Sequence, residues 1–391
     1  MSSSERKKFI LGDISEFRYG KMPDKTVVSD VGVYPVFSGY KYNGYYPEYN
    51  CEEGKLIVVA RGVGGTGDVK ITREKCWLTN LAIEFRLDQS VADIPFLYFY
   101  FLKDTLRYLD SGSAQSQITI DDLKRITIEV PPLEDQKRIA SILSALDEKT
   151  ELNRQTNQTL EAVAQAIYKE WFVNFNFPGS TGEMQDSELG PIPKGWRIGR
   201  IGELSYVQNG YAFKSNIFSE IGECGVIKIK NISCNLVDVR NMQYVASDAV
   251  KGLDEKFKVN PESLLIAMTG AEVGKIGLVP FADKELWLNQ RVGMFIEKIS
   301  NSNCFLYVLL SANDYQSIIR NSALGSAQPN ISASVIESIK AILPSDELIV
   351  KYGEIVRPLF DKLLQNVFEI NALTQIRDTL LPKLMNGEIE V

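Results

Sequence analysis

The stretch from Pro131 to Phe177 constrains the fold more than any other part of the chain. It contains no glycine and no proline between Leu133 and Phe177. Steps of three and four residues from Ile139 trace one helical stripe: Ile139, Ile142, Leu146, Lys149, Asn153, Thr156, Leu160, Val163 and Ile167. Apolar residues occupy both ends of the stripe and polar residues its middle. The pattern predicts one long amphipathic helix over 133–177 that packs on another helix.

The same stripe recurs near the end of the chain, 213 residues later. Its positions are Tyr352, Ile355, Leu359, Lys362, Asn366, Glu369, Leu373, Ile376 and Leu380. We therefore expect a second long helix over 345–391, each helix reaching roughly 60 Å at about 1.5 Å per residue. The alternative is that each helix packs only on its own globular domain.

The globular regions before the two helices also match in order. IVVARG at 57–62 corresponds to LIAMTG at 265–270, and WLTN at 77–80 to WLNQ at 287–290. LGDISEF at 11–17 is matched to IGRIGEL at 198–204, and GSAQ occurs at 112–115 and again at 325–328. These matches predict a tandem repeat with an internal two-fold, which makes the two helices antiparallel.

Short strand patterns dominate both globular regions. The predicted fold class is α+β (mixed α/β), with two β-rich domains and two long antiparallel coiled-coil-like helices. The expected boundaries are domain 1 over 1–132, helix over 133–177, linker over 178–195, domain 2 over 196–344 and helix over 345–391. The linker is rich in glycine and proline.

Composition excludes several classes of protein. The chain has no histidine, which removes Ser-His-Asp and Cys-His catalysis and histidine-containing zinc sites. Five cysteines without a C-x-x-C pair fit reduced thiols in the cytoplasm. The start MSSSERKKFILGD lacks the apolar run of a signal peptide, and FLYFYFL at 96–102 is too short to span a membrane.

The net charge of −7 is unevenly distributed. Residues 134–175 hold 5 basic and 7 acidic side chains, and residues 345–391 hold 5 and 8. Most of the acidity therefore lies on the predicted helices, which we expect to face protein, while the nearly neutral domains remain able to present a basic face to nucleic acid.

Two glycine-rich motifs resemble nucleotide-binding loops. GVGGTG at 62–67 fits the dinucleotide pattern G-x-G-x-x-G but is followed by DVKI, which alternates as a strand does. GAEVGK at 270–275 is one residue short of a P-loop and is followed by isoleucine. A plain β-turn and a loop close to a DNA backbone are the other interpretations of Gly62–Gly67, the second with Arg61 and Thr66 available to phosphates.

Polar side chains in the predicted turns are the candidates for contact with DNA bases, because amides and cations can bind base edges. In domain 1 they are Lys41, Tyr42, Asn43, Arg61, Thr66, Ser113 and Gln115. In domain 2 they are Asn209, Tyr211, Lys214, Lys275, Asn289, Gln290, Arg291 and Gln328. Turn formation or capping is the alternative role for each, and Gln115 and Gln328 can instead stabilise the domain–helix junction.

The chain resembles the specificity subunit of type I restriction–modification systems. The resemblance lies in PPLEDQKRIASILSALDEKTELNRQ, in PKGWRIGRIGELSYVQNGYAFKS, in the two GSAQ turns, and in WLNQRV and LLPKLMNGEI. It covers the whole chain, with the linker at 178–195 and a break expected at Pro382 as local departures.

The resemblance implies two target-recognition domains, each reading one half of a split double-stranded DNA sequence. It also implies that the antiparallel helices bind two methyltransferase subunits and that restriction subunits join the complex. S-adenosylmethionine and ATP would then belong to those partners, with no cofactor or metal and no active site in this chain. A protein scaffold without a DNA role and a dinucleotide-binding enzyme remain the alternatives.

Overall fold

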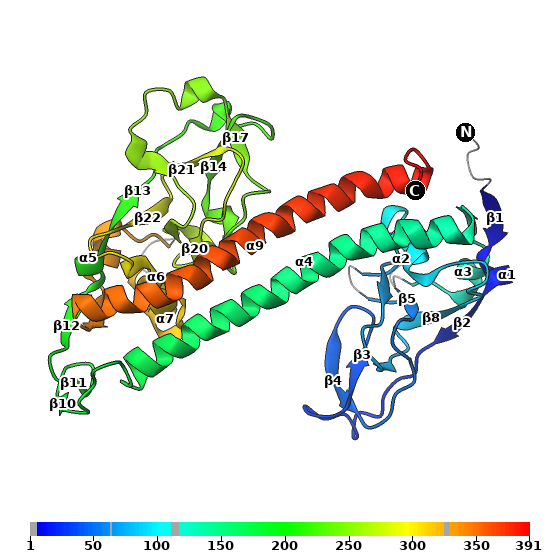
Figure 1. Ribbon diagram of the computed structural model, residues 1–391, viewed down its shortest axis with the longest axis horizontal. Coiled ribbons are helices and arrows are strands. Elements are labelled where there is room, and N and C mark those ends of the chain that lie inside the picture. The colour runs from blue at the N-terminus through cyan, green and yellow to red at the C-terminus, as the bar shows by residue number, and fades with distance from the viewer. Residues whose placement is uncertain (1–5, 63–64, 111–116, 324–328) are drawn as a thin grey trace. The chain divides into compact units, whose positions relative to one another are not determined.

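The computed structural model describes residues 6–62, 65–110, 117–323 and 329–391 (Figure 1). It divides into two compact units, one formed by residues 1–149 with 373–391 and the other by residues 150–372. Helices α4 (Leu133–Tyr168) and α9 (Asp346–Asn386) each contribute one segment to the first unit and one to the second.

The described residues of the first unit form a four-stranded and a three-stranded sheet. One has the strand order β2-β8-β5-β6 and is antiparallel throughout, and the other has the order β4-β3-β7 with a parallel β3–β7 pair. Strand β1 pairs separately with β9, directly before α4 begins. The strands are β1 (Lys7–Ile10), β2 (Ser15–Tyr19), β3 (Tyr34–Phe37), β4 (Tyr42–Tyr46), β5 (Leu56–Val59), β6 (Val69–Ile71), β7 (Trp77–Leu78), β8 (Ala82–Leu87) and β9 (Thr127–Val130). The helices are α1 (Leu11–Ile14), α2 (Ile94–Lys103) and α3 (Ile120–Lys124).

The second unit repeats this plan with additions. The order β13-β22-β19-β20 corresponds to β2-β8-β5-β6 and is extended by β16 and β15, while β17-β14-β21 is extended by β18. Strand β12 pairs with β23 directly before α9 begins. The strands are β12 (Arg197–Arg200), β13 (Ser205–Asn209), β14 (Cys224–Ile227), β15 (Ile232–Ser233), β16 (Asn235–Val237), β17 (Gln243–Val245), β18 (Lys258–Val259), β19 (Leu264–Ala267), β20 (Ile276–Leu278), β21 (Glu285–Leu288), β22 (Val292–Glu297) and β23 (Lys340–Leu343). The helices are α5 (Ile201–Leu204), α6 (Ser302–Ser311), α7 (Asn313–Ser322) and α8 (Ala333–Ser338).

Matching hydrogen bonds establish the internal repeat and correct its register. The Leu11 N–H donates to the Ile126 carbonyl at 2.8 Å, and the Ile201 N–H donates to the Ile339 carbonyl at 3.0 Å. LGDISEF therefore corresponds to IGELSYV at 201–207, three residues beyond the predicted match. The offset is 190 residues between Leu11 and Ile201 and 213 residues between Ile126 and Ile339. The offset is therefore not constant, because the second unit has additional residues inside its globular part.

The helix segments lie antiparallel within each unit (Figure 1), as predicted. In the second unit the Asn153 Nδ2 donates to the Glu369 Oε2 at 2.9 Å, and the Asn366 Nδ2 donates to the Asn157 Oδ1 at 2.8 Å. In the first unit the Arg377 Nη1 donates to the Asp147 Oδ1 at 2.8 Å. Residue numbers thus rise on α4 as they fall on α9. Asn153 and Asn366, both buried, favour this register, since it gives the Nδ2 group of each an acceptor on the facing helix.

Some of the apolar residues predicted for the seam are buried or half-buried, as expected, and the others are exposed. Ile139, Leu146, Leu160 and Ile167 on α4 are buried or half-buried, as are Leu359, Leu373 and Leu380 on α9. Ile142, Val163, Ile355 and Ile376 are instead 40–46% exposed. The residues after them, Leu143, Ala164, Val356 and Arg377, occupy the seam. Both choices satisfy a helical period, and only the partner helix decides between them.

Each helical pair belongs to the core of its own unit. The first core contains Ile139, Leu143, Leu381 and Leu384 together with Leu56, Phe85 and Phe96 of the globular part. The second contains Ala164, Tyr352, Val356 and Phe360 together with Leu264, Phe295 and Phe305. The globular parts are therefore anchored on the helix segments rather than linked by flexible chain.

Three local expectations were inaccurate. Helix α4 ends at Tyr168 and is followed by a π-helical turn, Lys169–Val173, so the regular helix is shorter than 133–177. Helix α9 continues through Pro382, where a break was expected. The segment 178–195 contains a small hairpin formed by β10 (Met184–Gln185) and β11 (Ile192–Pro193), with Ile192 buried in the second core. Among the described residues no helix is long and apolar enough to cross a bilayer.

The corrected seam makes a prediction about stability. Leu143→Ala should destabilise the first unit by about 2–4 kcal/mol, because Leu143 is fully buried in the core and truncation leaves a cavity. Ile142→Ala, one residue away and 40% exposed, should cost less than about 0.5 kcal/mol and is the matched control. Thermal unfolding and hydrogen exchange of the first unit measure both. Equal losses would mean that Ile142 also packs in the seam.

Candidate nucleic-acid interface

Four backbone segments of the first unit meet at one end of its four-stranded sheet. The Ala60 N–H, just after β5, donates to the Leu81 carbonyl in the turn before β8 at 2.8 Å. The Ile118 N–H donates to the Ala60 carbonyl at 2.9 Å, and the Lys21 N–H donates to the Leu78 carbonyl at 2.9 Å. These bonds hold several exposed turns in fixed mutual positions.

The second unit builds the same arrangement with other side chains. The Met268 N–H donates to the Arg291 carbonyl at 3.0 Å, and the Ile331 N–H donates to the Met268 carbonyl at 3.0 Å. The Tyr211 N–H donates to the Leu288 carbonyl at 2.8 Å. The two units therefore present equivalent sets of turns on an equivalent backbone.

The two nucleotide-like glycine motifs are the same turn in the two units. The Gly67 N–H donates to the Val59 carbonyl and the Gly274 N–H donates to the Ala267 carbonyl, both at 2.9 Å. Gly67 and Gly274 have φ values of +92° and +88°, which only glycine adopts without strain. The turns lead into strands β6 and β20, whereas dinucleotide and P-loop sites need a helix there. Both are hairpin turns.

The candidate residues of the first unit fall into three groups. Lys41, Asn43 and Arg61 are exposed, and Arg61 forms a backbone bridge with Gln117. Tyr42 stacks on Phe37 with ring centroids 4.5 Å apart, and partial burial raises the pKa of its phenol. Thr66 is buried and donates to the Gly62 carbonyl at 3.1 Å, so it braces its own loop and is turned away from solvent.

Four of the candidate residues of the second unit, Tyr211, Asn289, Gln290 and Arg291, lie next to one another. Tyr211 forms a parallel bridge with Asn289, and the Gln290 N–H donates to the Tyr211 carbonyl at 2.9 Å. Gln290 and Arg291 are exposed beside them, whereas Asn289 is buried. Asn209 and Lys214 are also exposed, and Lys275 forms an ion pair with Glu272. Ser113, Gln115 and Gln328 lie outside the described residues.

The sequence prediction missed one exposed position in each set of turns. Tyr40 follows β3 and Lys230 follows β14, and both are exposed. The only available signal was their place just after a buried strand, because Tyr40 lies in a passage with many tyrosines. Burial and the nearby Lys230 lower the pKa of Lys228, which lies over the Phe218 ring.

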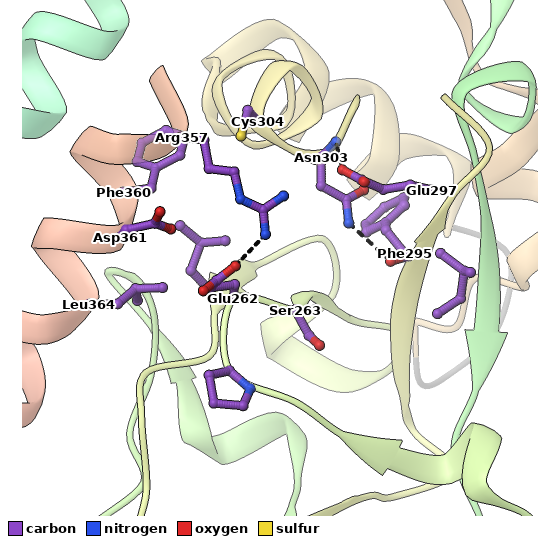
Figure 2. A pocket seen from close by; sticks show the side chains of 13 residues that line it. Glu262, Ser263, Phe295, Glu297, Asn303, Cys304, Arg357, Phe360, Asp361 and Leu364 are labelled. Atoms are coloured by element: carbon purple, nitrogen blue, oxygen red, sulfur yellow. Dashed lines mark hydrogen bonds and ion pairs between the residues drawn. The ribbon is translucent and has the colours of Figure 1, made fainter. Parts of the chain in front are cut away.

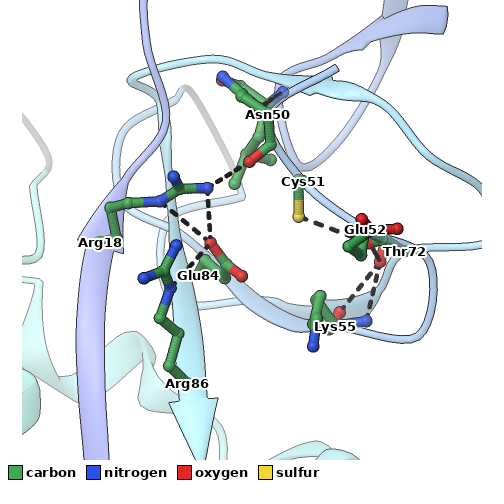
Figure 3. A network of polar contacts seen from close by, with 9 residues as sticks. Arg18, Asn50, Cys51, Glu52, Lys55, Thr72, Glu84 and Arg86 are labelled. Carbon is green, nitrogen blue, oxygen red and sulfur yellow. Dashed lines mark hydrogen bonds and ion pairs between the residues drawn. The ribbon is translucent and has the colours of Figure 1, made fainter.

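Two further polar sites belong to one unit each. In the first unit Arg18 and Arg86 both pair with Glu84, which is buried (Figure 3). The cross-strand pair Arg18–Glu84 corresponds to Gln208–Met294 in the second unit, so this ion pair is not part of the repeat. In the second unit a cavity of about 370 Å³ lies between α9 and the globular part, where Arg357 pairs with Glu262 (Figure 2).

Comparison with known proteins identifies the class. A model of the type I restriction modification DNA specificity domain matches residues 3–162 and 193–373. The MjaIX specificity subunit of Methanocaldococcus jannaschii is 28% identical over 305 residues, covering 76% of this chain and 69% of that protein. The MjaVIII specificity subunit of the same organism is 26% identical over 399 residues, covering 97% and 92%.

The fold also matches a solved structure. The crystal structure of the type I restriction–modification S subunit from M. genitalium superposes with a TM-score of 0.72 at 21% identity, covering 98% of this chain and 97% of that one. The chain therefore belongs to the type I restriction modification DNA specificity domain family. It is a specificity subunit, the class whose members recognise DNA targets.

The shared glycine turn generates a prediction. Gly67→Ala should destabilise the first unit by about 2 kcal/mol or more, because the positive φ strains alanine and its Cβ would lie 2.6 Å from the Arg107 backbone nitrogen. Gly54→Ala also has a positive φ of +73° but meets no atom within 4 Å, so it should cost only about 1 kcal/mol. Chemical unfolding monitored in the first unit compares the two. Equal losses would mean that the close approach to Arg107 is unimportant.

Proposed function

We propose that the two globular domains read two different half-sites of one split, non-palindromic DNA target. The observation that supports this proposal most directly is that equivalent turns of the two units hold different side chains. Arg61 in the first unit corresponds to Thr269 in the second, and the turn Thr79–Leu81 corresponds to Asn289–Arg291. Domains with one backbone plan and different exposed groups would approach DNA alike and select different bases.

The chemistry of the exposed groups fits base and phosphate contacts. Arginine binds guanine in the major groove, and glutamine or asparagine binds adenine, each through two hydrogen bonds. Lysines and backbone N–H groups set register on the phosphates. Arg61 and Lys41 would serve the first half-site, and Gln290 and Arg291 the second. Asn43, Tyr211, Asn209 and Lys214 flank these positions, and Tyr42 would pack against the sugar–phosphate chain.

In the proposed complex this chain contributes recognition and its partners contribute catalysis. Methyltransferase and restriction subunits of the type I system would hold S-adenosylmethionine and ATP, and the complex would act on DNA in the cytoplasm. Support comes from membership of the specificity family and from the hairpin geometry of both glycine motifs, which does not suit a nucleotide.

Two methyltransferase subunits would bind, one on each repeat of the helical pair. Ile142 and Ile355 are related by the repeat, as are Val163 and Ile376, and all four are exposed. Each immediately precedes a seam residue, so the two in each unit flank the seam of that unit on the same side. The first unit contains Ile142 with Ile376, and the second contains Ile355 with Val163, which gives two equivalent apolar patches. Exposed aliphatic residues that the duplication retains fit one partner bound twice.

Single substitutions should separate the half-sites. Arg61→Ala should weaken discrimination in the first half-site about 10- to 100-fold and leave the second unchanged, because one bidentate base contact contributes about 1–3 kcal/mol. Arg291→Ala should do the converse, so each variant is the control for the other. Methylome sequencing with the cognate methyltransferase gives both half-sites. A single variant that changed both half-sites, or a continuous palindromic target, would contradict the assignment.

The two patches make a prediction about stoichiometry. Ile142→Lys with Ile376→Lys should remove one of two methyltransferase subunits in native mass spectrometry, because charge replaces the apolar contact of one patch. Ile355→Lys with Val163→Lys should remove the other. Leu152→Lys is the control, because Leu152 is 56% exposed but corresponds to a glutamine, Gln365, in the repeat. A wild-type complex with one methyltransferase at saturation would refute the proposal.

A further inference from the structure

Tyr40 is an exposed aromatic side chain in the turn between β3 and β4 of the first unit. Its side chain is 48% exposed, and its ring lies against Gly62, where a Cβ would approach the ring Cε1 to 3.1 Å. The missing side chain at Gly62 therefore makes room for one part of the ring, and the remainder is available to a ligand.

The turn that carries Tyr40 is held rigidly. The Ser38 N–H and hydroxyl both donate to the Lys41 carbonyl, at 3.1 and 3.0 Å, and the Lys41 N–H donates to the Ser38 Oγ at 3.3 Å. Gly39 has a φ of +92° and packs between Val59 and Ala82, which a Cβ would approach to 3.0 and 3.3 Å. A ring presented by such a turn loses little conformational freedom on binding.

The turn lies beside the segments that face DNA in the proposed function. The Thr79 N–H donates to the Phe37 carbonyl at 2.9 Å, which places the Tyr40 turn next to the turn before β8. In the second unit the Asn289 N–H donates to the Ile227 carbonyl at 3.1 Å in the same way. Phe37 and Ile227 are equivalent in the parallel strand pairs, but the chain after them differs: β3 leads through the Tyr40 turn into β4, whereas β14 leads into the 3-10 helix Ile229–Asn231. The turn that presents Tyr40 is therefore a feature of the first unit, and the exposed Lys230 lies on the 3-10 helix that follows the equivalent strand in the second.

The surroundings of Tyr40 suit a nucleic-acid backbone. The Lys41 Nζ lies 5.8 Å from the Tyr40 ring centroid, and the exposed Arg61 immediately precedes Gly62. Two cations close to a half-exposed ring can bind phosphates while the ring reaches between them towards the bases.

We propose that Tyr40 is a specificity-determining residue of the first domain that stacks on a base step of its half-site and partly opens that step. The proposal rests on the proposed DNA-reading function and adds a mode of readout that needs no hydrogen bond to a base. Base steps differ in how easily they unstack, with pyrimidine–purine steps the softest, so an inserted ring selects sequence through deformability. The second domain has the 3-10 helix Ile229–Asn231 after the equivalent strand instead of this turn, and it lacks this mode.

The test uses the full chain assembled with its methyltransferase and duplexes that carry 2-aminopurine in one half-site at a time. With the wild-type chain, binding should raise 2-aminopurine fluorescence at one step of the first half-site, because unstacking relieves quenching. Tyr40→Ala should abolish that rise and weaken binding to the target roughly tenfold or more. Tyr40→Phe should keep the signal and bind within about twofold of wild type.

Tyr108→Ala is the matched control, because Tyr108 is 69% exposed in the same unit and lies in the 3-10 helix Leu106–Leu109. It should leave affinity and fluorescence unchanged. Equal losses for Tyr40→Phe and Tyr40→Ala would assign the effect to the hydroxyl and overturn stacking, as would an equal loss on unrelated DNA or no loss at all. A wild-type complex without any sequence preference would instead refute the proposed function, and thermal unfolding of Tyr40→Ala shows whether the domain stays folded.

Discussion

The packing of α4 against α9 is the interaction on which the rest of the structure depends. The seam is not a separate rod, since Ile139, Leu143 and Leu384 lie in the first core and Ala164, Tyr352 and Val356 in the second. Strand pairs β1–β9 and β12–β23 close each globular part directly before its helix begins. Anything that shifts the register of the helices therefore repacks both cores. The buried amides of Asn153 and Asn366 oppose such a shift, because each loses its partner on the facing helix.

The two halves of the duplication share their backbone contacts, whereas their side chains have diverged. The tight approaches of Gly20 to Leu78–Thr79 and of Gly210 to Leu288–Asn289 are the same contact in the two units, and neither place has room for a Cβ. Such contacts keep the turns in place. The segment between these strands differs in length. The offset between equivalent residues is 190 for Phe37 and Ile227 and 208 for Val59 and Ala267, so the second unit has inserted residues between Ile227 and Ala267. They add strands β15 and β16 and a small apolar core around Ile232, Val237 and Leu265.

The sequence was sufficient for features that repeat and insufficient for those that depend on a partner surface. The fold class, the antiparallel helices and the DNA-recognition class follow from periodicity, duplication and resemblance. The seam was misplaced at Ile142, Val163, Ile355 and Ile376, because a helical period alone does not say which neighbouring residue meets the other helix. The match of LGDISEF was three residues early, because few identities fixed its register. Thr66 could not be recognised as a buried brace, nor Tyr40 as an exposed ring, since both judgements need the neighbouring turns.

Exposed side chains at equivalent positions of the two units behave differently on the helices and on the turns: on the helices they are alike, and on the turns they differ. On the helices, Ile142 and Ile355 are both aliphatic and both exposed, as the proposed binding of one partner to each repeat requires. On the turns, the equivalent positions Leu81 and Arg291 hold an apolar and a charged side chain, as the proposed reading of two different half-sites requires. A surface that is alike in both units fits two copies of one partner. A surface that differs between the units on the same backbone fits two different sequences of the same kind of ligand. A single DNA molecule with two unlike half-sites, served by two like methyltransferases, satisfies both conditions together.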